Sequence, residues 1–231
     1  MHLPPLPFGK YYFELFKKTQ KQELVRFLQG SFRVDEPLNR ASKISGEELE
    51  SCLEEVLDRS LALPSSSLLA RSQESHDIVG CALTSLWRRE DSVAKKESDF
   101  NFKTTRKEVA VVGEILNELH ERFWALQPDH DVVIHYPLAS VDNRHRGTGL
   151  AQKMCNWADD EERVRSYGAT GVVGEATSIV SQRLLAQYGY KTIDTILLKT
   201  KLDPETGKQI LLCDNGTDRI NLVFKDYLRK F

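Results

Sequence analysis

The segment Arg144–Gly149 (RHRGTG) constrains the fold of this chain most, because it stands between an apolar run at 132–134 and an amphipathic helical pattern. A helix N-terminus leaves backbone N–H groups without intrahelical partners and carries the positive end of the helix dipole. Glycine lets the backbone turn tightly and approach a ligand with no Cβ in the way. The segment therefore predicts a phosphate-binding loop at a strand–helix junction.

Two common phosphate-binding patterns do not fit this loop. The Walker pattern needs Lys and then Ser or Thr after its last glycine, whereas Leu150 follows Gly149 here. The dinucleotide pattern needs a third glycine, and Gln152 occupies that position. The pattern that remains is Arg-x-x-Gly-x-Gly, and a pair of turn glycines before a helix is the alternative interpretation.

Length and charge limit the class of protein. The 231 residues are 40% hydrophobic and show no repeat or linker, so we expect a single domain over 1–231 with a flexible N-terminal segment at 1–10. The net charge of −2 shows no excess of basic residues of the kind that binds nucleic acid. Four scattered cysteines and the absence of a signal-like or membrane-length apolar run indicate a cytoplasmic protein with no membrane partner. We expect it to be a monomer.

Hydrophobic periodicity predicts alternating strands and helices in the second half of the chain. The expected elements are a strand at 131–141, a helix at 147–167, a strand at 169–176, a helix at 178–188 and a strand at 190–199. This βαβαβ order implies a parallel strand pair, with ligands beyond the carboxyl ends of the strands. Ser45 and Glu48 form a capping box that predicts the start of an earlier helix. The polar stretch 88–103 has no periodicity and is expected to be a mobile loop or a poorly packed connection. A role as a substrate loop and disorder without a role are both left open for it.

Other catalytic chemistries lack their signatures. No two of the six histidines stand at metal-ligand spacing, so we expect no metal site. The Gly-x-Ser-x-Gly elbow of Ser-His-Asp hydrolases is also missing.

The order of motifs resembles that of the GNAT N-acetyltransferases. The matching features are the Arg-x-x-Gly-x-Gly loop with Leu150 and Ala151, the segment 176–181 (ATSIVS) before a helix, and the pair Gly189-Tyr190. The resemblance implies an α/β fold whose central mixed sheet has a splayed parallel strand pair flanked by helices. It also implies acetyl-CoA as the cofactor, with CoA as product.

The segment 32–39 (FRVDEPLN) resembles the DEPLN element of the insect-type arylalkylamine (dopamine) N-acetyltransferases. That resemblance implies a small-molecule amine acceptor such as dopamine, tyramine, octopamine or serotonin. It places the catalytic base at Glu36, which would remove a proton from an ammonium group whose pKa is roughly 10. An exposed turn before Pro37 is the alternative interpretation of this segment.

The resemblance also assigns residues to acetyl-CoA. They are Leu138, Ala139, Val141, Arg144, His145, Arg146, Gly147, Thr148, Gly149 and Leu150. The Ala139 amide is the first candidate to stabilise the oxyanion of the tetrahedral intermediate. Pro137 cannot donate to a ladder, which fits a strand that parts from its neighbour, and a misassigned strand end is the alternative. His145 is discounted as a base, because it would lie at the phosphate end of the cofactor.

Protonation of the leaving thiolate is the step for which the usual residue is absent. Many GNAT enzymes use a tyrosine four residues before the Gly-aromatic pair, and Leu185 occupies that position. Thr177 and Ser181 match hydroxyl positions of the arylalkylamine subfamily, which implies that they act here instead. Capping of the following helix is the alternative role for these hydroxyls.

Three functions are left open by the sequence. The first is acetyl transfer to a small arylalkylamine, with Phe32 and Trp87 as candidates to stack on the aromatic ring. Packing in the core is the alternative role for these two side chains. The second is acetyl transfer to a protein N-terminus, a lysine or a polyamine. The third is a catalytically silent acyl-CoA-binding module, which Leu185 favours.

Overall fold

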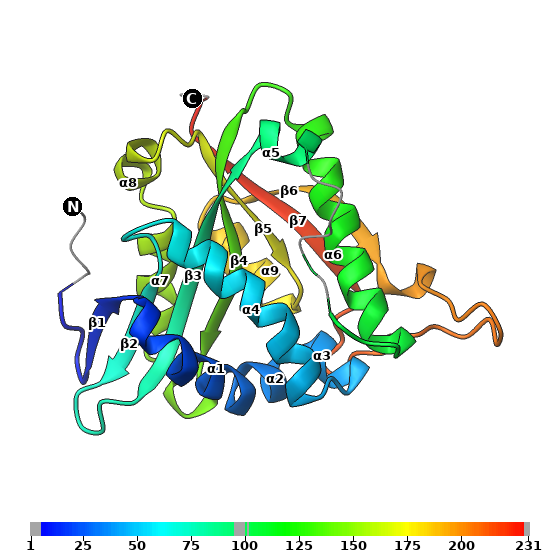
Figure 1. The fold of residues 1–231 in the computed structure, drawn as a ribbon, viewed down its shortest axis with the longest axis horizontal. Helices are drawn as coiled ribbons and strands as arrows, with labels where there is room; N and C mark the ends of the chain where they lie inside the picture. Colours follow the sequence, from blue (N-terminus) through cyan, green and yellow to red (C-terminus); the bar gives the residue numbers. More distant parts are fainter. Residues whose placement is uncertain (1–5, 95–99, 101, 229–231) are drawn as a thin grey trace.

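A mixed sheet forms the centre of the molecule (Figure 1). The computed structural model describes residues 6–94, 100 and 102–228. In these residues seven strands pair in the order β1-β2-β3-β4-β5-β7-β6. The strands are β1 (Tyr11–Leu15), β2 (Leu68–Ser72), β3 (Ile78–Arg88), β4 (Val132–Val141), β5 (Gly171–Ala176), β6 (Lys191–Leu197) and β7 (Arg219–Asp226).

The expected parallel pair is confirmed as β4 and β5. All other neighbouring strands in the described sheet are antiparallel. The last strand, β7, inserts between β5 and β6, so these two strands do not pair with each other. The chain therefore has the mixed α/β architecture that the sequence predicted.

Helices cover both faces of the sheet. They are α1 (Lys21–Gly30), α2 (Phe32–Asp35), α3 (Pro37–Ser42), α4 (Gly46–Ala62), α5 (Arg89–Ala94), α6 (Lys107–Leu126), α7 (Leu150–Ala158), α8 (Glu161–Ser166) and α9 (Ile179–Gln187). Figure 1 shows α1, α4 and α6 on the near face and α7, α8 and α9 behind it.

Alternation along the strands divides the core between these two layers. On β3, Cys81 and Leu83 pack with the buried residues of α1 and α4. Ala82, which lies between them, packs on the opposite face with Met154 of α7. This period of two is what a strand covered on both faces requires.

The capping box predicted at Ser45 is confirmed. Ser45 Oγ accepts a hydrogen bond from the Glu48 amide at 3.1 Å, and Glu48 Oε2 accepts one from the Ser45 amide at 2.9 Å. Two donors that the helix leaves unpaired are thereby satisfied at the start of α4.

The single helix predicted over 147–167 is wrong, because the structure divides it into α7 and α8. Asp160 begins α8 by accepting a hydrogen bond from the Arg163 amide at 2.8 Å. Asp159 is buried and forms an ion pair with Lys225 of β7 at 2.5 Å. The helical hydrophobic pattern continues across this break, so periodicity alone could not reveal it.

The loop expected over 88–103 is also partly wrong. β3 continues to Arg88, and α5 occupies Arg89–Ala94. Phe100 is buried, and its backbone N–H donates to the Asn117 side chain of α6 at 3.0 Å. Residues 95–99 and 101 of this stretch lie outside the described residues, as do residues 1–5 of the expected N-terminal segment.

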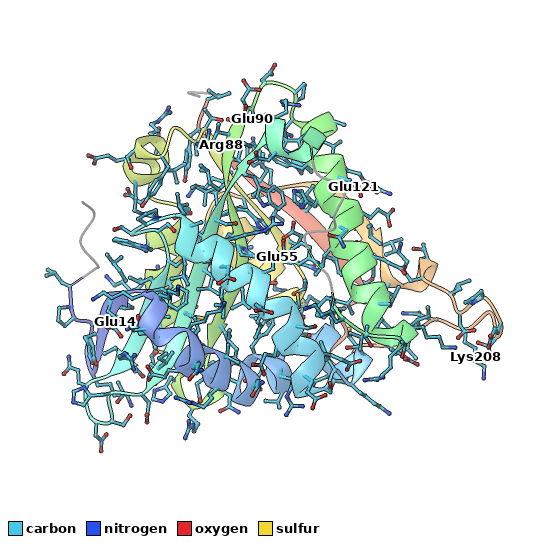
Figure 2. All side chains as sticks on the ribbon, viewed as in Figure 1. Glu14, Glu55, Arg88, Glu90, Glu121 and Lys208 are labelled. Carbon is cyan, nitrogen blue, oxygen red and sulfur yellow. The ribbon has the colours of Figure 1, made fainter. Side chains whose placement is uncertain are left out.

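Charged side chains lie mainly at the surface, as the dispersed charges of the sequence suggested. Glu90, Glu121 and Lys208, labelled in Figure 2, are all exposed. No helix among the described residues is long and apolar enough to cross a membrane.

The tight β5–β7 pairing yields a stability prediction. A Cβ at Gly171 would lie 2.5 Å from Phe224 Cζ and 2.7 Å from the Lys225 carbonyl oxygen. We expect Gly171→Ala to lower the free energy of unfolding by about 1–3 kcal/mol, measured by urea denaturation. Gly30→Ala is the matched control, because its Cβ would meet no atom within 4 Å. Equal unfolding midpoints for the two variants would contradict this account of the packing.

Candidate active site

β4 and β5 part soon after they pair. Their parallel register joins Ile134 to Val172 and His135 to Val173, and no later pair is formed in the described sheet. Pro137 follows in β4 and has no N–H to donate. β3 is irregular opposite this point, between Leu83 and Ser85. The splay expected from Pro137 is therefore present, and it opens the sheet between the two strands.

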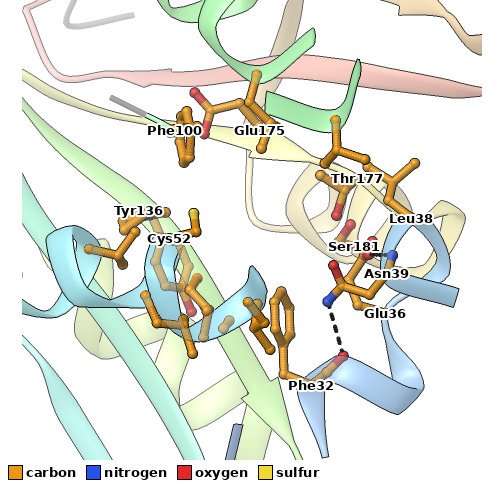
Figure 3. Close-up of a pocket in the computed structure, with 18 of the residues that line it drawn as sticks. Phe32, Glu36, Leu38, Asn39, Cys52, Phe100, Tyr136, Glu175, Thr177 and Ser181 are labelled. Atoms are coloured by element: carbon orange, nitrogen blue, oxygen red, sulfur yellow. Dashed lines mark hydrogen bonds between the residues drawn. The ribbon is translucent and has the colours of Figure 1, made fainter. Parts of the chain in front are cut away.

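A cavity of about 160 Å³ lies at this opening (Figure 3). An engineered apolar cavity of roughly 150 Å³ is large enough to hold benzene, so the space here suits a group the size of one aromatic ring. Its walls are mostly apolar and come from both helical layers. They include Phe32, Leu53, Val56, Phe100, Phe102, Val112, Leu116, Leu138, Leu184 and Leu185.

The predicted phosphate loop is presented with its backbone exposed. Gly147 and Gly149 have φ values of 72° and 84°, in the left-handed region that favours glycine. A Cβ at Gly147 would meet no atom within 4 Å. Gly149 is the N-cap of α7 and offers no side-chain cap, so N–H groups of its first turn remain available. This cradle fits a diphosphate.

Side chains of this loop are held by the protein itself. Arg144 is ion-paired with Asp142 at 2.9 Å, and its hydrogen bonds hold the pKa of Asp142 below the usual range. Arg146 forms an ion pair with Asp35 at 2.9 Å. Thr148 Oγ1 donates to the His145 carbonyl oxygen at 2.7 Å. The backbone N–H groups of the loop are therefore the main groups that remain available to bind a ligand.

The remaining residues assigned to acetyl-CoA lie on β4 and at the helix start. Leu138 is buried and Ala139 is exposed, and both line the cavity. Val141 pairs with Gly80 of β3 and leads into the loop. Leu150, the first residue of α7, is buried in the core. The structure thus forms a continuous path from the cavity to the loop.

Glu36 joins α2 to α3 and reaches the cavity. Its Oε2 accepts a hydrogen bond from the Asn39 amide at 2.7 Å, which makes Glu36 the N-cap of α3, and Pro37 takes the first helical position. Its Oε1 is buried without a partner among the described residues. Burial raises the pKa of this carboxyl group to about 7, although hydrogen bonding from the Asn39 amide and from the Thr177 side chain opposes the shift. The exposed-turn interpretation of this segment is therefore wrong.

Thr177 and Ser181 lie beside Glu36 in Figure 3, and both line the cavity. Ser178, not Thr177, is the N-cap of α9, in a reciprocal capping box with Ser181. Ser181 Oγ also donates to the Ser178 carbonyl oxygen at 2.9 Å. Ser181 therefore combines the capping role with a place at the cavity wall, and Leu185 lies one helical turn further on.

Trp87 and His145, which the sequence suggested for the site, do not line the cavity. Trp87 does not line the cavity, because its ring stacks between His120 and His135 at centroid distances of 3.4 and 3.8 Å. His145 hydrogen-bonds to the Tyr11 hydroxyl at 3.1 Å, away from the cavity lining. Phe32 does line the cavity, as a substrate-facing residue would.

Sequence reasoning missed several wall residues. Phe100 and Phe102 belong to the stretch 88–103, for which a substrate-loop role was left open but no wall residue was named, and Glu175 was counted only as part of a strand. One signal for Glu175 was available, because it stands only two residues before Thr177, which was already a candidate. Within the described residues no group of three or more His, Cys, Asp or Glu side chains could hold a metal.

Comparisons with known proteins agree with this architecture. No model of a known protein family matches the chain. Arylalkylamine N-acetyltransferase 2 from Aedes aegypti is 25% identical, with a TM-score of 0.77 over 95% of this chain and 100% of that one. A polyamine N-acetyltransferase from Drosophila melanogaster is 18% identical, with a TM-score of 0.75 over 94% and 99%. Arabidopsis thaliana Naa50, solved with the bisubstrate analogue CoA-Ac-MVNAL, is 9% identical, with a TM-score of 0.51 over 95% and 100%.

The splayed parallel pair and these likenesses define a GNAT-fold protein. The chain is an acetyl-transferring enzyme of this class. Among solved structures it resembles the insect arylalkylamine N-acetyltransferases.

The raised pKa of Glu36 predicts a pH-dependent stability. The folded protein releases this proton near pH 7 and the unfolded chain near 4.5, so the folded state holds more protons between these values and stability falls as pH rises through them. Relative to Glu36→Gln, the wild type should lose on the order of 1–3 kcal/mol of unfolding free energy between pH 5 and pH 8. Urea denaturation at several pH values measures this difference. Glu54→Gln, on the exposed side of α4, is the control and should keep the wild-type dependence of unfolding free energy on pH. If the wild type and Glu36→Gln show the same dependence on pH, Glu36 is not a buried acid with a raised pKa.

Proposed function

We propose that this enzyme transfers the acetyl group of acetyl-CoA to the primary amine of a small arylalkylamine. The observation that carries the proposal is a buried carboxyl group, Glu36, in an apolar cavity at the parting of β4 and β5. A neighbouring structure of similar fold is that of an arylalkylamine N-acetyltransferase, at 25% identity. We further expect one domain, a monomeric state and a cytoplasmic location, which stay predictions.

Acetyl-CoA would be held by the residues assigned to it from Leu138 to Leu150. The amides of the Gly147–Gly149 loop and of the first turn of α7 would bind its diphosphate. When bound, acetyl-CoA supplies an acetyl thioester as the activated group. The opening between β4 and β5, with Ala139 exposed on its edge, is where the thioester end would lie.

Glu36 would act as the general base. An arylalkylamine is mostly protonated at neutral pH and has no lone pair for attack until a proton is removed. A carboxyl group with a pKa of about 7 is a stronger base than an ordinary glutamate, and about half of it is ionised at pH 7 and most of it at pH 8. Its unpartnered Oε1 is the atom that would take the proton, directly or through one water.

The remaining steps follow from the same geometry. As the amine nitrogen bonds to the carbonyl carbon, the carbonyl oxygen becomes an oxyanion, which the Ala139 amide would stabilise. The carbon–sulfur bond then breaks and leaves a thiolate. Thr177 or Ser181 would supply its proton, although a thiolate with a pKa of roughly 8–9 is an acceptable leaving group without one.

The small volume of the cavity, about 160 Å³, supports a small acceptor over a peptide. Side chains of α4 and α6 wall it, including Leu53, Val56 and Val112. A protein N-terminus or an internal lysine would need a groove open for the flanking residues. Polyamines and a silent acyl-CoA-binding role stay as alternatives that a panel of amines with a thiol-release assay would distinguish.

Replacing the base gives the first functional prediction. Glu36→Gln should lower kcat/KM for tyramine by about 10²–10⁴, because general-base catalysis is lost. In the wild type, kcat/KM should rise with pH through about 7 as Glu36 ionises, and this limb should be absent from the variant. The affinity for acetyl-CoA should change little. A variant with the wild-type pH profile would exclude Glu36 as the base.

The phosphate loop gives a second prediction. Gly147→Val should weaken acetyl-CoA binding at least 10-fold by calorimetry, because valine disfavours the left-handed backbone and places methyl groups where the diphosphate would lie. Gly207→Val is the matched control, since Gly207 also has a positive φ of 65° and open space around it. Both variants should lose stability, but only Gly147→Val should lose affinity. Equal affinities would show that the loop does not bind the cofactor.

A further inference from the structure

Two carboxyl groups with an unsatisfied buried oxygen line the same cavity. Several buried side-chain atoms in the described residues have no hydrogen-bond partner, and Glu36 Oε1 and Glu175 Oε1 are those that belong to acidic residues of this cavity. A buried acceptor left unpaired is costly, because it has lost its hydrogen bonds to water and gained none in return. A ligand that donates a hydrogen bond to each oxygen would remove both costs. Glu36 has a role in the proposed reaction, whereas Glu175 has none.

Glu175 is held in a fixed orientation. Its Oε2 lies 2.9 Å from His135 Nε2, and the two side chains are only 3% and 5% exposed. The His135 ring stacks on Trp87 at a centroid distance of 3.8 Å. The second oxygen, Oε1, is therefore fixed at the cavity wall without a partner of its own. Such rigidity is typical of a recognition group.

The position of Glu175 separates it from the reacting end. Figure 3 places Glu175 with Phe100 on one side of the cavity and Glu36 with Ser181 on the other. Glu175 is the second-to-last residue of β5, and Thr177 is the first residue after that strand. Asn39, Thr177 and Ser181 also lie toward Glu36. A ligand whose amine meets Glu36 would thus reach Glu175 with its far end.

The surroundings of Glu175 fit one neutral donor better than a cation. An ammonium group carries three N–H donors that each need an acceptor, whereas a phenol has a single O–H donor. Glu175 offers one unpartnered oxygen, because His135 occupies the other. The nearby walls are apolar side chains such as Phe100, Val112 and Leu116, whose side chains offer no further acceptor. An aromatic ring between them would contact apolar surface on several sides.

We propose that Glu175, oriented by His135, accepts a hydrogen bond from a ring hydroxyl of the acceptor and so selects phenolic arylalkylamines over those without a hydroxyl. This specificity role rests on the proposed function, because it needs the amine at Glu36. Glu175 contacts substrate in this arrangement, and His135 is a positioning residue.

Tyramine and phenethylamine test the proposal, because they differ by the ring hydroxyl alone. For the wild type, kcat/KM should be roughly 10- to 100-fold higher for tyramine, because phenethylamine would leave a buried acceptor without a partner. Glu175→Leu should reduce this ratio to about 1 or below, chiefly by lowering kcat/KM for tyramine. Glu175→Gln, which keeps an acceptor oxygen, should restore part of the preference. Melting temperature and acetyl-CoA affinity, measured for each variant, serve as controls for folding.

The outcomes separate the two proposals. Equal kcat/KM for the two amines in the wild type would overturn the role of Glu175 and leave the proposed function standing. A folded Glu175→Leu variant that loses both activities equally would do the same. Turnover of putrescine with none of either arylalkylamine would overturn the proposed function itself. The wild-type ratio needs no variant, so the proposal stays testable even if Glu175→Leu does not fold.

Discussion

The loss of pairing between β4 and β5 after His135 is the constraint on which the rest of the site depends. A continuous parallel ladder would satisfy both strand edges and leave no passage between the helical layers. Pro137 removes one donor, and the irregularity of β3 opposite it lets β4 turn away. β5 stays in the sheet because it pairs with β7 as far as Ala176. One strand is therefore free to part while its neighbour stays fixed, and both the cavity and the helix that follows β5 are placed at the gap.

Helix capping and burial have opposite effects on the ionised carboxyl group of Glu36: capping stabilises it and burial destabilises it. The Asn39 amide binds one oxygen, which anchors the side chain and contributes about 1 kcal/mol, as an N-cap usually does. Burial of the other oxygen raises the pKa to about 7, so the anion is destabilised at the pH where a base must work. The stability lost on ionisation is the same free energy that strengthens the base. A fully hydrogen-bonded carboxylate here would give a more stable protein and a weaker base.

Local signals allowed much of the fold to be predicted, and long-range packing accounts for what was missed. The strand before the glycine loop, the parallel pair and the capping box at Ser45 all follow from neighbouring residues. The break at Asp159 depends on Lys225 of β7, which is distant in sequence. Phe100 and Phe102 belong to a stretch without periodicity, and they line the cavity because α6 provides the surface on which they pack. Glu175 shows the same limit, since an acidic residue in a strand reads as solvent-exposed until His135 is placed beside it.

The segment that carries Glu36 is also tied to both ends of the site. Arg146 of the phosphate loop is ion-paired with Asp35, the residue before Glu36. Arg40 of α3 binds Asp214 through two hydrogen bonds, which links this segment to the long connection between β6 and β7. Arg146 and Asp214 are each more than half exposed, so such pairs add little to the free energy of folding. Their effect is geometric, because they hold the base at a fixed place relative to the loop that would bind the cofactor. Precise placement matters more for catalysis than for stability, since a shift of about 1 Å in a reacting group can cost roughly 10²-fold in rate.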